Sequence, residues 1–277
     1  MFWNIYESEE FTVKENNLKE ERLILLSNDD GIAAKGLQSL IEVAREFGRV
    51  VVVAPADAMS GMSHAITIKT PLRSRKVKDE EGLKIYSCQG TPVDCIKLAL
   101  NQLLDRRPDM ILSGINHGSN SSSSIVYSGT MAAAMEGSIN LVPSVGFSLL
   151  DYDPDADFTA SREVVRKVLY NILDRGLSEN VCLNVNIPAV PLKKLKGIKI
   201  CRQTKGYWKE EFVRRVDPQN GEYFWLTGSY FNQETEAEDT DEYALRHNYA
   251  SIVPVKVDLT AYDSITQLKK WNLNSFE

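Results

Sequence analysis

The sequence predicts an α/β fold in which a mostly parallel sheet is flanked by helices. Short apolar runs at 22–26, 50–55 and 109–114 have the composition of strands that are buried on both faces of a sheet. Between these runs, apolar residues recur at helical spacing over 37–44 and 93–104. Strands that alternate with helices in this way form βαβ units, whose strands run parallel.

A polar turn with two adjacent acids follows the first strand directly. Its residues are Ser27-Asn28-Asp29-Asp30-Gly31, so the carboxylates lie at the carboxyl end of the strand. In open α/β sheets, ligands bind at this edge. Two neighbouring acids repel each other, and a bound Mg²⁺ or Mn²⁺, which takes oxygen ligands, would relieve that repulsion. The alternative is an Asx-type turn that caps the next helix, with the second acid solvated.

The second strand and the segments after it add further polar groups. The loop after 50–55 contains Ser60 and His64, and we expect it at the same edge as the two acids. Segment 72–88 alternates loosely around a turn and predicts a hairpin. Thr91-Pro92-Val93-Asp94 predicts a capped helix start, and Asn116 belongs to the predicted loop 115–120 after the third strand.

A second helix start suits an anion. Ser128-Gly129-Thr130 precedes a run of small residues that predicts a helix to about 137. Such a start offers unpaired backbone N–H groups and the positive end of the helix dipole, both of which favour phosphate. A strand at 143–149, a helix over 164–172 and a strand at 181–187 complete the predicted core.

These loops together indicate phosphate chemistry. Two carboxylates, a hydroxyl and an amide carbonyl could ligate one cation, and they come from Asp29, Asp30, Ser60 and Asn116. A cation beside a phosphate site suits phosphoester hydrolysis, because it polarises a phosphoryl oxygen and lowers the pKa of bound water.

The pattern changes after Pro188, and we divide the chain into an N-terminal extension at 1–20, a core at 21–190 and a C-terminal extension at 191–277. The C-terminal extension is expected to hold a strand at 249–259 and a short final helix. It is rich in aromatic residues that could stack on a base, although a subunit interface is the preferred interpretation: Tyr207, Trp208, Phe212, Tyr223, Phe224 and Trp225.

Composition narrows the functional class. The formal net charge of −6 provides no basic field for nucleic acid. The four cysteines form no C-x-x-C pair and lie in or beside apolar stretches, which indicates buried, reduced thiols. The sequence shows neither a signal-peptide pattern nor an apolar stretch of membrane-spanning length, so we expect a cytoplasmic protein without membrane contact.

Six short motifs then resemble the SurE family of survival proteins, which are divalent-metal-dependent 5'-nucleotidases. They occur in the family's order and approximate spacing at 27–32, 53–55, 60–64, 90–95, 113–116 and 127–130. The resemblance covers 23–149 closely and the rest loosely. It implies a Rossmann-like core whose C-terminal part is exchanged between the subunits of a homodimer, sometimes assembled further into a tetramer.

The resemblance also implies roles for individual residues. One Mg²⁺ or Mn²⁺ per subunit would be bound by Asp29, Asp30, Ser60 and Asn116, and phosphate by Asn120, Ser128, Gly129 and Thr130. The implied activity is release of phosphate from nucleoside 5'-monophosphates, and relatives also accept 3'-nucleotides or short polyphosphate. Asp29 would be the catalytic residue, either by activating the attacking water or by attacking phosphorus itself. The chain departs from the family at Ser122-Ser123-Ser124, where a Gly-Asp-Asp stretch is common.

Three further points stay open at this stage. Either His64 or His117 could protonate a leaving oxygen, and His64 is the one kept as a candidate acid, because His117 is interpreted as a variable neighbour of Asn116. An aspartyl-nucleophile phosphatase is a second enzyme hypothesis, although such enzymes usually space their acids as Asp-x-Asp. A third hypothesis is that the protein is not an enzyme but an assembly module that binds metal and nucleotide without turnover.

Overall fold

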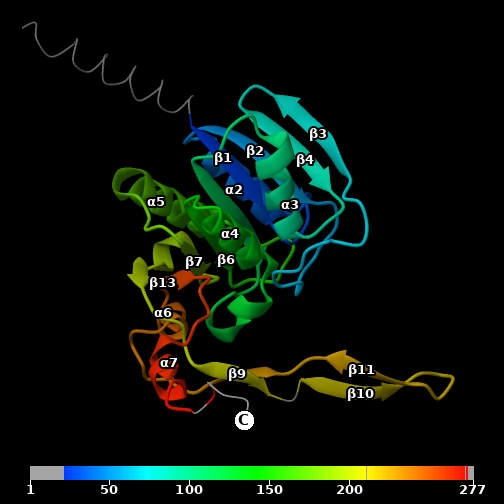
Figure 1. The fold of residues 1–277 in the computed structure, drawn as a ribbon, viewed down its shortest axis with the longest axis vertical. Coiled ribbons are helices and arrows are strands. Elements are labelled where there is room, and N and C mark those ends of the chain that lie inside the picture. Colours follow the sequence, from blue (N-terminus) through cyan, green and yellow to red (C-terminus); the bar gives the residue numbers. More distant parts are fainter. Residues whose placement is uncertain (1–21, 210, 272, 274–277) are drawn as a thin grey trace, which may run out of the picture.

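The computed structural model describes residues 22–209, 211–271 and 273, so the predicted extension at 1–20 lies outside the described residues. The predicted fold class is confirmed: a nine-stranded, mostly parallel sheet lies between helices (Figure 1). The strand order is β3-β4-β2-β1-β5-β6-β7-β13-β8. Its six parallel central strands are β4 Leu83–Cys88, β2 Arg49–Pro55, β1 Leu23–Ser27, β5 Met110–His117, β6 Ser144–Leu149 and β7 Val181–Ile187.

The two ends of the sheet are antiparallel. At one end, β3 Ser74–Glu80 forms the predicted hairpin with β4. At the other end, β13 Ala250–Lys256 runs antiparallel to β7 and parallel to β8 Ile198–Ile200. The C-terminal third of the chain therefore completes the central sheet.

Helices cover both faces of the sheet. On one face, α2 Lys35–Ala44 contacts α5 Thr159–Arg175, and on the other α3 Pro92–Leu98 contacts α4 Gly129–Ile139. A π-helical turn, Ala99–Leu103, extends α3. Successive side chains of a strand point to opposite faces of the sheet, which explains these layers. In β1, Ile24 and Leu26 pack in one apolar cluster while Leu23 and Leu25 pack in the other.

Local signals in the sequence also appear in the structure. Thr91 and Asp94 form the predicted capping box, in which the Thr91 hydroxyl accepts the Asp94 N–H at 3.1 Å and an Asp94 oxygen accepts the Thr91 N–H at 2.9 Å. All four cysteines are buried and free, as predicted. In the described part of the chain, no helix has the length and apolar character needed to cross a membrane.

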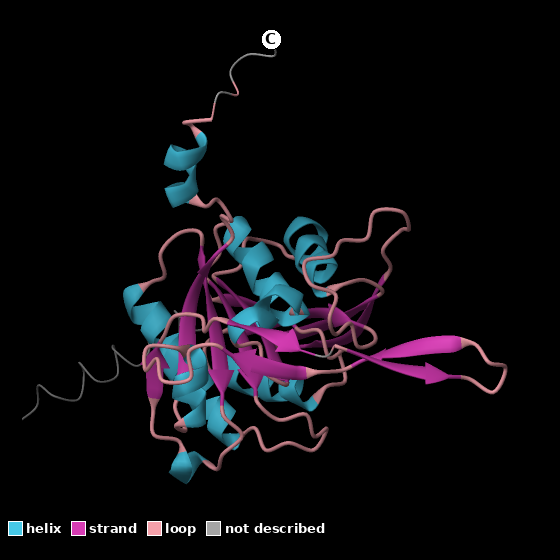
Figure 2. Cartoon of the chain, turned by 90° about the horizontal axis from the view of Figure 1, so that it is seen from below, coloured by secondary structure: helices cyan, strands magenta, loops and turns pink. Residues whose placement is uncertain are grey.

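The remaining C-terminal elements lie beside the sheet or project from it. Helix α6 Asp241–Arg246 packs near β13, and α7 Tyr262–Leu268 follows β13. Strand β9 Gly206–Lys209 pairs with β12 Ser229–Asn232. Beyond them, β10 Phe212–Val216 and β11 Glu222–Leu226 form a ribbon that extends away from the body (Figures 1 and 2).

A buried carboxylate fastens the C-terminal region to the serine-rich turn. Asp241 is fully buried, and its Oδ2 accepts the Ser122 N–H at 2.8 Å. Its Oδ1 accepts the Thr204 N–H at 3.0 Å, while the Ser122 hydroxyl donates to the Thr204 carbonyl at 2.8 Å. Ser122 begins a 3₁₀ turn over Ser122–Tyr127, and a second such turn spans Leu192–Lys194. These bonds satisfy both buried oxygens of the Asp241 carboxylate.

Candidate functional site

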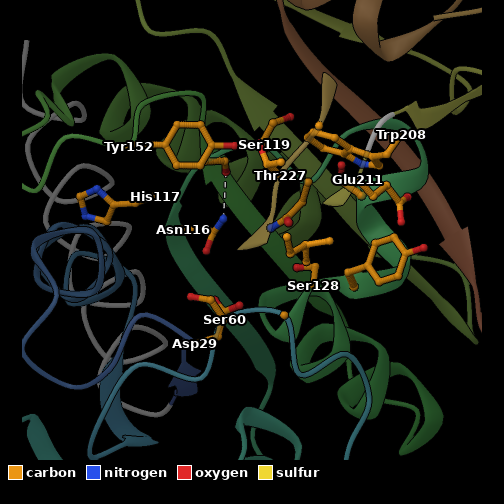
Figure 3. A pocket seen from close by; sticks show the side chains of 17 residues that line it. Asp29, Ser60, Asn116, His117, Ser119, Ser128, Tyr152, Trp208, Glu211 and Thr227 are labelled. Atoms are coloured by element: carbon orange, nitrogen blue, oxygen red, sulfur yellow. Dashed lines mark hydrogen bonds between the residues drawn. The ribbon is translucent and has the colours of Figure 1, made fainter. Parts of the chain in front are cut away.

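A cavity of about 660 Å³ opens at the carboxyl edge of the parallel strands. Five of the residues predicted for the site line it, from four separate segments of the chain: Asp29, Ser60, Asn116, Asn120 and Ser128 (Figure 3). The βαβ topology explains the meeting, because it places the carboxyl ends of parallel strands at one edge.

Asp29 lies at the base of the cavity and is only 3% exposed. The Thr130 hydroxyl donates to its Oδ1, and the Met59 N–H donates to its backbone carbonyl at 2.7 Å. Burial raises the pKa of the Asp29 carboxyl to about 6; hydrogen bonds from Thr130 oppose that shift, and the nearby Asp30 charge adds to it. Asp29 is therefore a carboxylate held in a fixed orientation.

Asp30 does not line the cavity. Its Oδ2 accepts the His117 N–H at 2.9 Å, and burial raises the pKa of its carboxyl. The Asn28 side-chain nitrogen donates to the Gly31 carbonyl at 2.8 Å, which closes the turn, but this bond does not form the Asx-type turn considered from the sequence, in which the side-chain oxygen would accept. In addition, α2 begins four residues after Gly31 and has Ala34 at its N-cap, without a side-chain cap. The two acids thus do not cap the helix, and neither is simply solvated.

Asn116 lies in β5 instead of the predicted loop 115–120. The strand continues past a register shift between Ser113 and Asn116, which brings the Asn116 side chain to the cavity. Its amide nitrogen donates to the Gly118 carbonyl at 2.9 Å. The amide oxygen is therefore the end left to face Asp29 and Ser60 (Figure 3).

This donor set fits a hard divalent cation. Asp29, Asp30, Ser60 and Asn116 offer oxygen atoms only, which suits Mg²⁺ or Mn²⁺ better than zinc. Among the described residues, no group of three His, Cys, Asp or Glu side chains could hold a metal ion. A cation here would therefore depend on the neutral oxygens of Ser60 and Asn116 as well as on the two acids.

The N-terminus of α4 forms the anion side of the site. Ser128 is its N-cap, and the Ser128 hydroxyl accepts the Met131 N–H at 3.0 Å. At the first helical position, a Cβ on Gly129 would lie 2.8 Å from the Asp29 Cβ. Thr130 is fully buried and its hydroxyl points to Asp29, so the structure gives Thr130 an orienting contact that sequence analysis missed.

Asn120 is held by a network of buried amides. Its N–H donates to Asn186 Oδ1, its side-chain nitrogen donates to Ser148 Oγ, and its carbonyl accepts from Asn184, each at 2.8 Å. The Asn186 side chain in turn donates to Asn184 Oδ1 at 2.9 Å. The roles of Asn184 and Asn186 were not predicted, although two asparagines in an otherwise apolar strand are the signal that could have identified them.

The two histidines lie in different environments. His64 Nε2 lies 3.0 Å from Glu136 Oε2, and His64 is not among the residues that line the cavity. His117 does line it, with its ring packed edge-on against Phe158 at a centroid distance of 5.1 Å. Of the two, His117 is therefore the one with access to a substrate in this cavity.

Glu136 anchors the loop that carries Ser60. Its side chain is buried on α4 and bonds His64 of this loop, while Lys97 Nζ lies 2.8 Å from its other oxygen. Burial alone would raise the pKa of Glu136, but hydrogen bonds from His64, Lys97 and Asn140 outweigh it and lower this pKa below 4.5.

We expect Glu136→Gln to reduce the free energy of unfolding by about 2 kcal/mol at pH 7, because a buried charge-assisted network loses its centre. A carboxylate with a lowered folded pKa stabilises the protein above its unfolded pKa, and this stabilisation disappears as the pH falls through the folded pKa. The difference between variant and wild type should therefore shrink below pH ~4.5 in urea titrations. Glu163→Gln, which removes an exposed partner of Arg166, is the control and should change stability by less than about 0.5 kcal/mol. Equal effects of the two variants would contradict the anchoring role.

The fold and the site together define an α/β protein with a cavity where Asp29 meets the N-terminus of α4, at the carboxyl edge of a parallel sheet. Comparison with known proteins gives the family. Residues 24–210 match the family model of survival protein SurE, and the chain belongs to this family.

Relatives cover almost the whole chain. The 5'-nucleotidase SurE of Flavobacterium psychrophilum is 51% identical over 253 residues, covering 91% of this chain and 98% of that protein. The 5'-nucleotidase SurE of Christiangramia forsetii is 51% identical over 258 residues, covering 92% and 99%. The crystal structure of the SurE protein from Aquifex aeolicus superposes with a TM-score of 0.78 at 37% identity, covering 89% of this chain and 98% of the other.

Proposed function

We propose that this protein is a divalent-metal-dependent 5'-nucleotidase that releases phosphate from nucleoside 5'-monophosphates. The observation that carries the proposal is the convergence of Asp29, Ser60 and Asn116 on one cavity beside the N-terminus of α4. Relatives named 5'-nucleotidase SurE support it at about half sequence identity over nearly the full chain. By resemblance, 3'-nucleotides and short polyphosphate are further candidate substrates.

The proposed mechanism assigns each group a task. Asp29, Asp30, Ser60 and Asn116 would hold one Mg²⁺ or Mn²⁺, which would polarise the phosphate as a Lewis acid and lower the pKa of water. Asp29 orients the attacking water and accepts its proton, while Thr130 keeps the Asp29 carboxylate in place. Ser128, Asn120 and the N–H of Gly129, the first residue of α4, would hold the phosphoryl oxygens during in-line attack.

Chelation tests this function. Purified protein is incubated with AMP and Mn²⁺ or Mg²⁺, and released phosphate is measured with and without EDTA. We expect release only with the metal and recovery of activity when metal is restored. Metal and nucleotide binding without release would contradict the proposal and favour the assembly module. The assembly module is considered because Ser124 lines the cavity at a position where the family commonly has an acid.

We also propose that the protein assembles as a homodimer or a tetramer through its C-terminal extension. Phe224 and Trp225 are neighbours in β11 and so point to opposite faces of the ribbon, and both are exposed in the single chain. A two-stranded ribbon with apolar groups on both faces is marginally stable alone, and a second copy of the chain would cover it.

We expect the double substitution Phe224→Asp and Trp225→Asp to lower the molar mass in solution, because charges would then enter the covered apolar contact. Size-exclusion chromatography with light scattering measures the mass. Val77→Asp on the exposed edge strand β3 is the control and should leave it unchanged. An unchanged mass for the double variant would contradict an interface at this ribbon.

The four buried, free cysteines support a reducing compartment, and we propose the cytoplasm. Their thiols are typical of intracellular proteins, in which disulfides are rare.

A further inference from the structure

Of the six aromatic residues singled out in the C-terminal extension, only Trp208 lines the cavity. Trp208 lines the same cavity as Asp29, Ser60 and Ser128. Tyr207, Phe212, Tyr223, Phe224 and Trp225 are also exposed but do not line it. Figure 3 shows Trp208 across the cavity from Asp29 and Ser60. Trp208 therefore faces the substrate site, whereas most of its aromatic neighbours belong to the projecting ribbon.

The Trp208 side chain packs against Tyr230, which is hydrogen-bonded to a turn beside the cavity. In the β9–β12 pair it stands opposite Tyr230, and the two rings meet edge-on with centroids 6.2 Å apart. The Tyr230 hydroxyl is hydrogen-bonded to the Ser122 hydroxyl, in the turn between Asn120 and Ser128. Gly206 leaves room for this ring, because a Cβ there would lie 2.0 Å from the Tyr230 oxygen. The Trp208 indole is therefore fixed in position at the wall of the cavity by these contacts.

The cavity is larger than a phosphate and one cation require. Its volume of about 660 Å³ falls within the ~300–1,000 Å³ range typical of sites that enclose a whole small molecule. Away from Asp29, its wall includes the apolar groups of Trp208, Leu226 and Tyr127. Trp208 is 36% exposed, so part of its surface is open to a ligand.

We propose that Trp208 provides the stacking surface for the base of the nucleotide, while the phosphate lies at the Asp29 and Ser128 end of the cavity. This inference rests on the proposed function and adds to it the residue that contacts the base. Stacking on an aromatic face needs no particular base, so purine and pyrimidine nucleotides should both bind, and the larger purines should bind more tightly.

Kinetics with and without a base tests the inference. We expect Trp208→Ala to raise KM for AMP about tenfold or more with kcat nearly unchanged, the loss typical of one base–aromatic stack. KM for ribose 5-phosphate, which lacks a base, should stay within about twofold, which also shows that the variant is folded. Trp208→Phe should restore most of the affinity for AMP. Trp225→Ala, on the ribbon outside the cavity, is the matched control and should leave the ratio of the two KM values unchanged.

A binding measurement separates this inference from the proposed function. Adenosine, which has no phosphate, is titrated into wild type and Trp208→Ala by calorimetry, and we expect its affinity to fall about tenfold in the variant. If the wild type hydrolysed neither AMP nor ribose 5-phosphate, the proposed function would be wrong. The adenosine titration would still decide the role of Trp208. Unchanged KM for AMP and unchanged adenosine affinity in Trp208→Ala would overturn the stacking surface.

Discussion

Asp29→Asn should reduce phosphate release from AMP by about three orders of magnitude. The substitution removes one negative charge from the cation site and also removes the group that accepts the proton of the attacking water. The side chain keeps its shape and size, and it stays in the buried turn between β1 and α2. We therefore expect a thermal midpoint close to that of the wild type. Steady-state release of phosphate with saturating Mn²⁺, together with a thermal melt, measures both effects.

A second acid provides the control for this result. Asp57 follows β2 in the loop that carries Ser60, but it is exposed and does not line the cavity. Asp57→Asn should retain at least about half of the activity, as surface substitutions usually do. If Asp29→Asn retained as much, Asp29 would have no part in the chemistry.

Isotope labelling tests the route in which the Asp29 carboxylate itself attacks phosphorus. A single turnover in ¹⁸O-water puts the label into phosphate when water attacks directly. When Asp29 attacks and the aspartyl-phosphate is hydrolysed at its carbonyl carbon, the label enters the Asp29 carboxylate. Label found in that side chain by mass spectrometry would replace the activated-water mechanism.

Gly129→Ala should cost about a hundredfold in kcat, since the positions of catalytic groups tolerate displacements of only a fraction of an ångström. The new Cβ would lie 2.8 Å from the Asp29 Cβ and 2.9 Å from its Oδ2, so the carboxylate must move. Alanine is a better helix former than glycine, so α4 itself should not be weakened by the change. Activity and helix content by circular dichroism therefore separate a displaced carboxylate from a lost helix.

Gly82→Ala gives a matched glycine substitution at a distance. Gly82 lies in the β3–β4 turn with open space around it and a positive φ of 73°. Its substitution should cost about 1 kcal/mol of stability through backbone strain and leave kcat unchanged. Wild-type kcat in Gly129→Ala would show that the close approach of α4 to Asp29 does not matter.

The sequence was sufficient for the parts of the site that depend on short-range order. Asp29 and Asp30 follow an apolar strand directly, and Ser60 follows another, so their shared edge could be predicted from parallel-strand topology. The capping box at Thr91 and the cap at Ser128 are likewise local signals.

Contacts between distant segments could not be predicted in this way. Asn116 was expected in a loop because periodicity does not reveal a register shift that prolongs β5. The bond between His64 and Glu136 joins residues 72 positions apart, and that between Thr130 and Asp29 joins residues 101 apart. No local pattern encodes such pairs. For the same reason the strand expected at 249–259 could be identified, but not its pairing with β7 in the central sheet.

The bond between Asp241 and Ser122 joins an early part of the chain to a late one. A nascent chain that has emerged through β7 already carries both acids, Ser60, Asn116 and the start of α4. It lacks the carboxylate that holds the Ser122 N–H, which is encoded 119 residues later. Ribosome-bound chains truncated before Asp241 should therefore be inactive, and activity should arise only once translation is nearly finished.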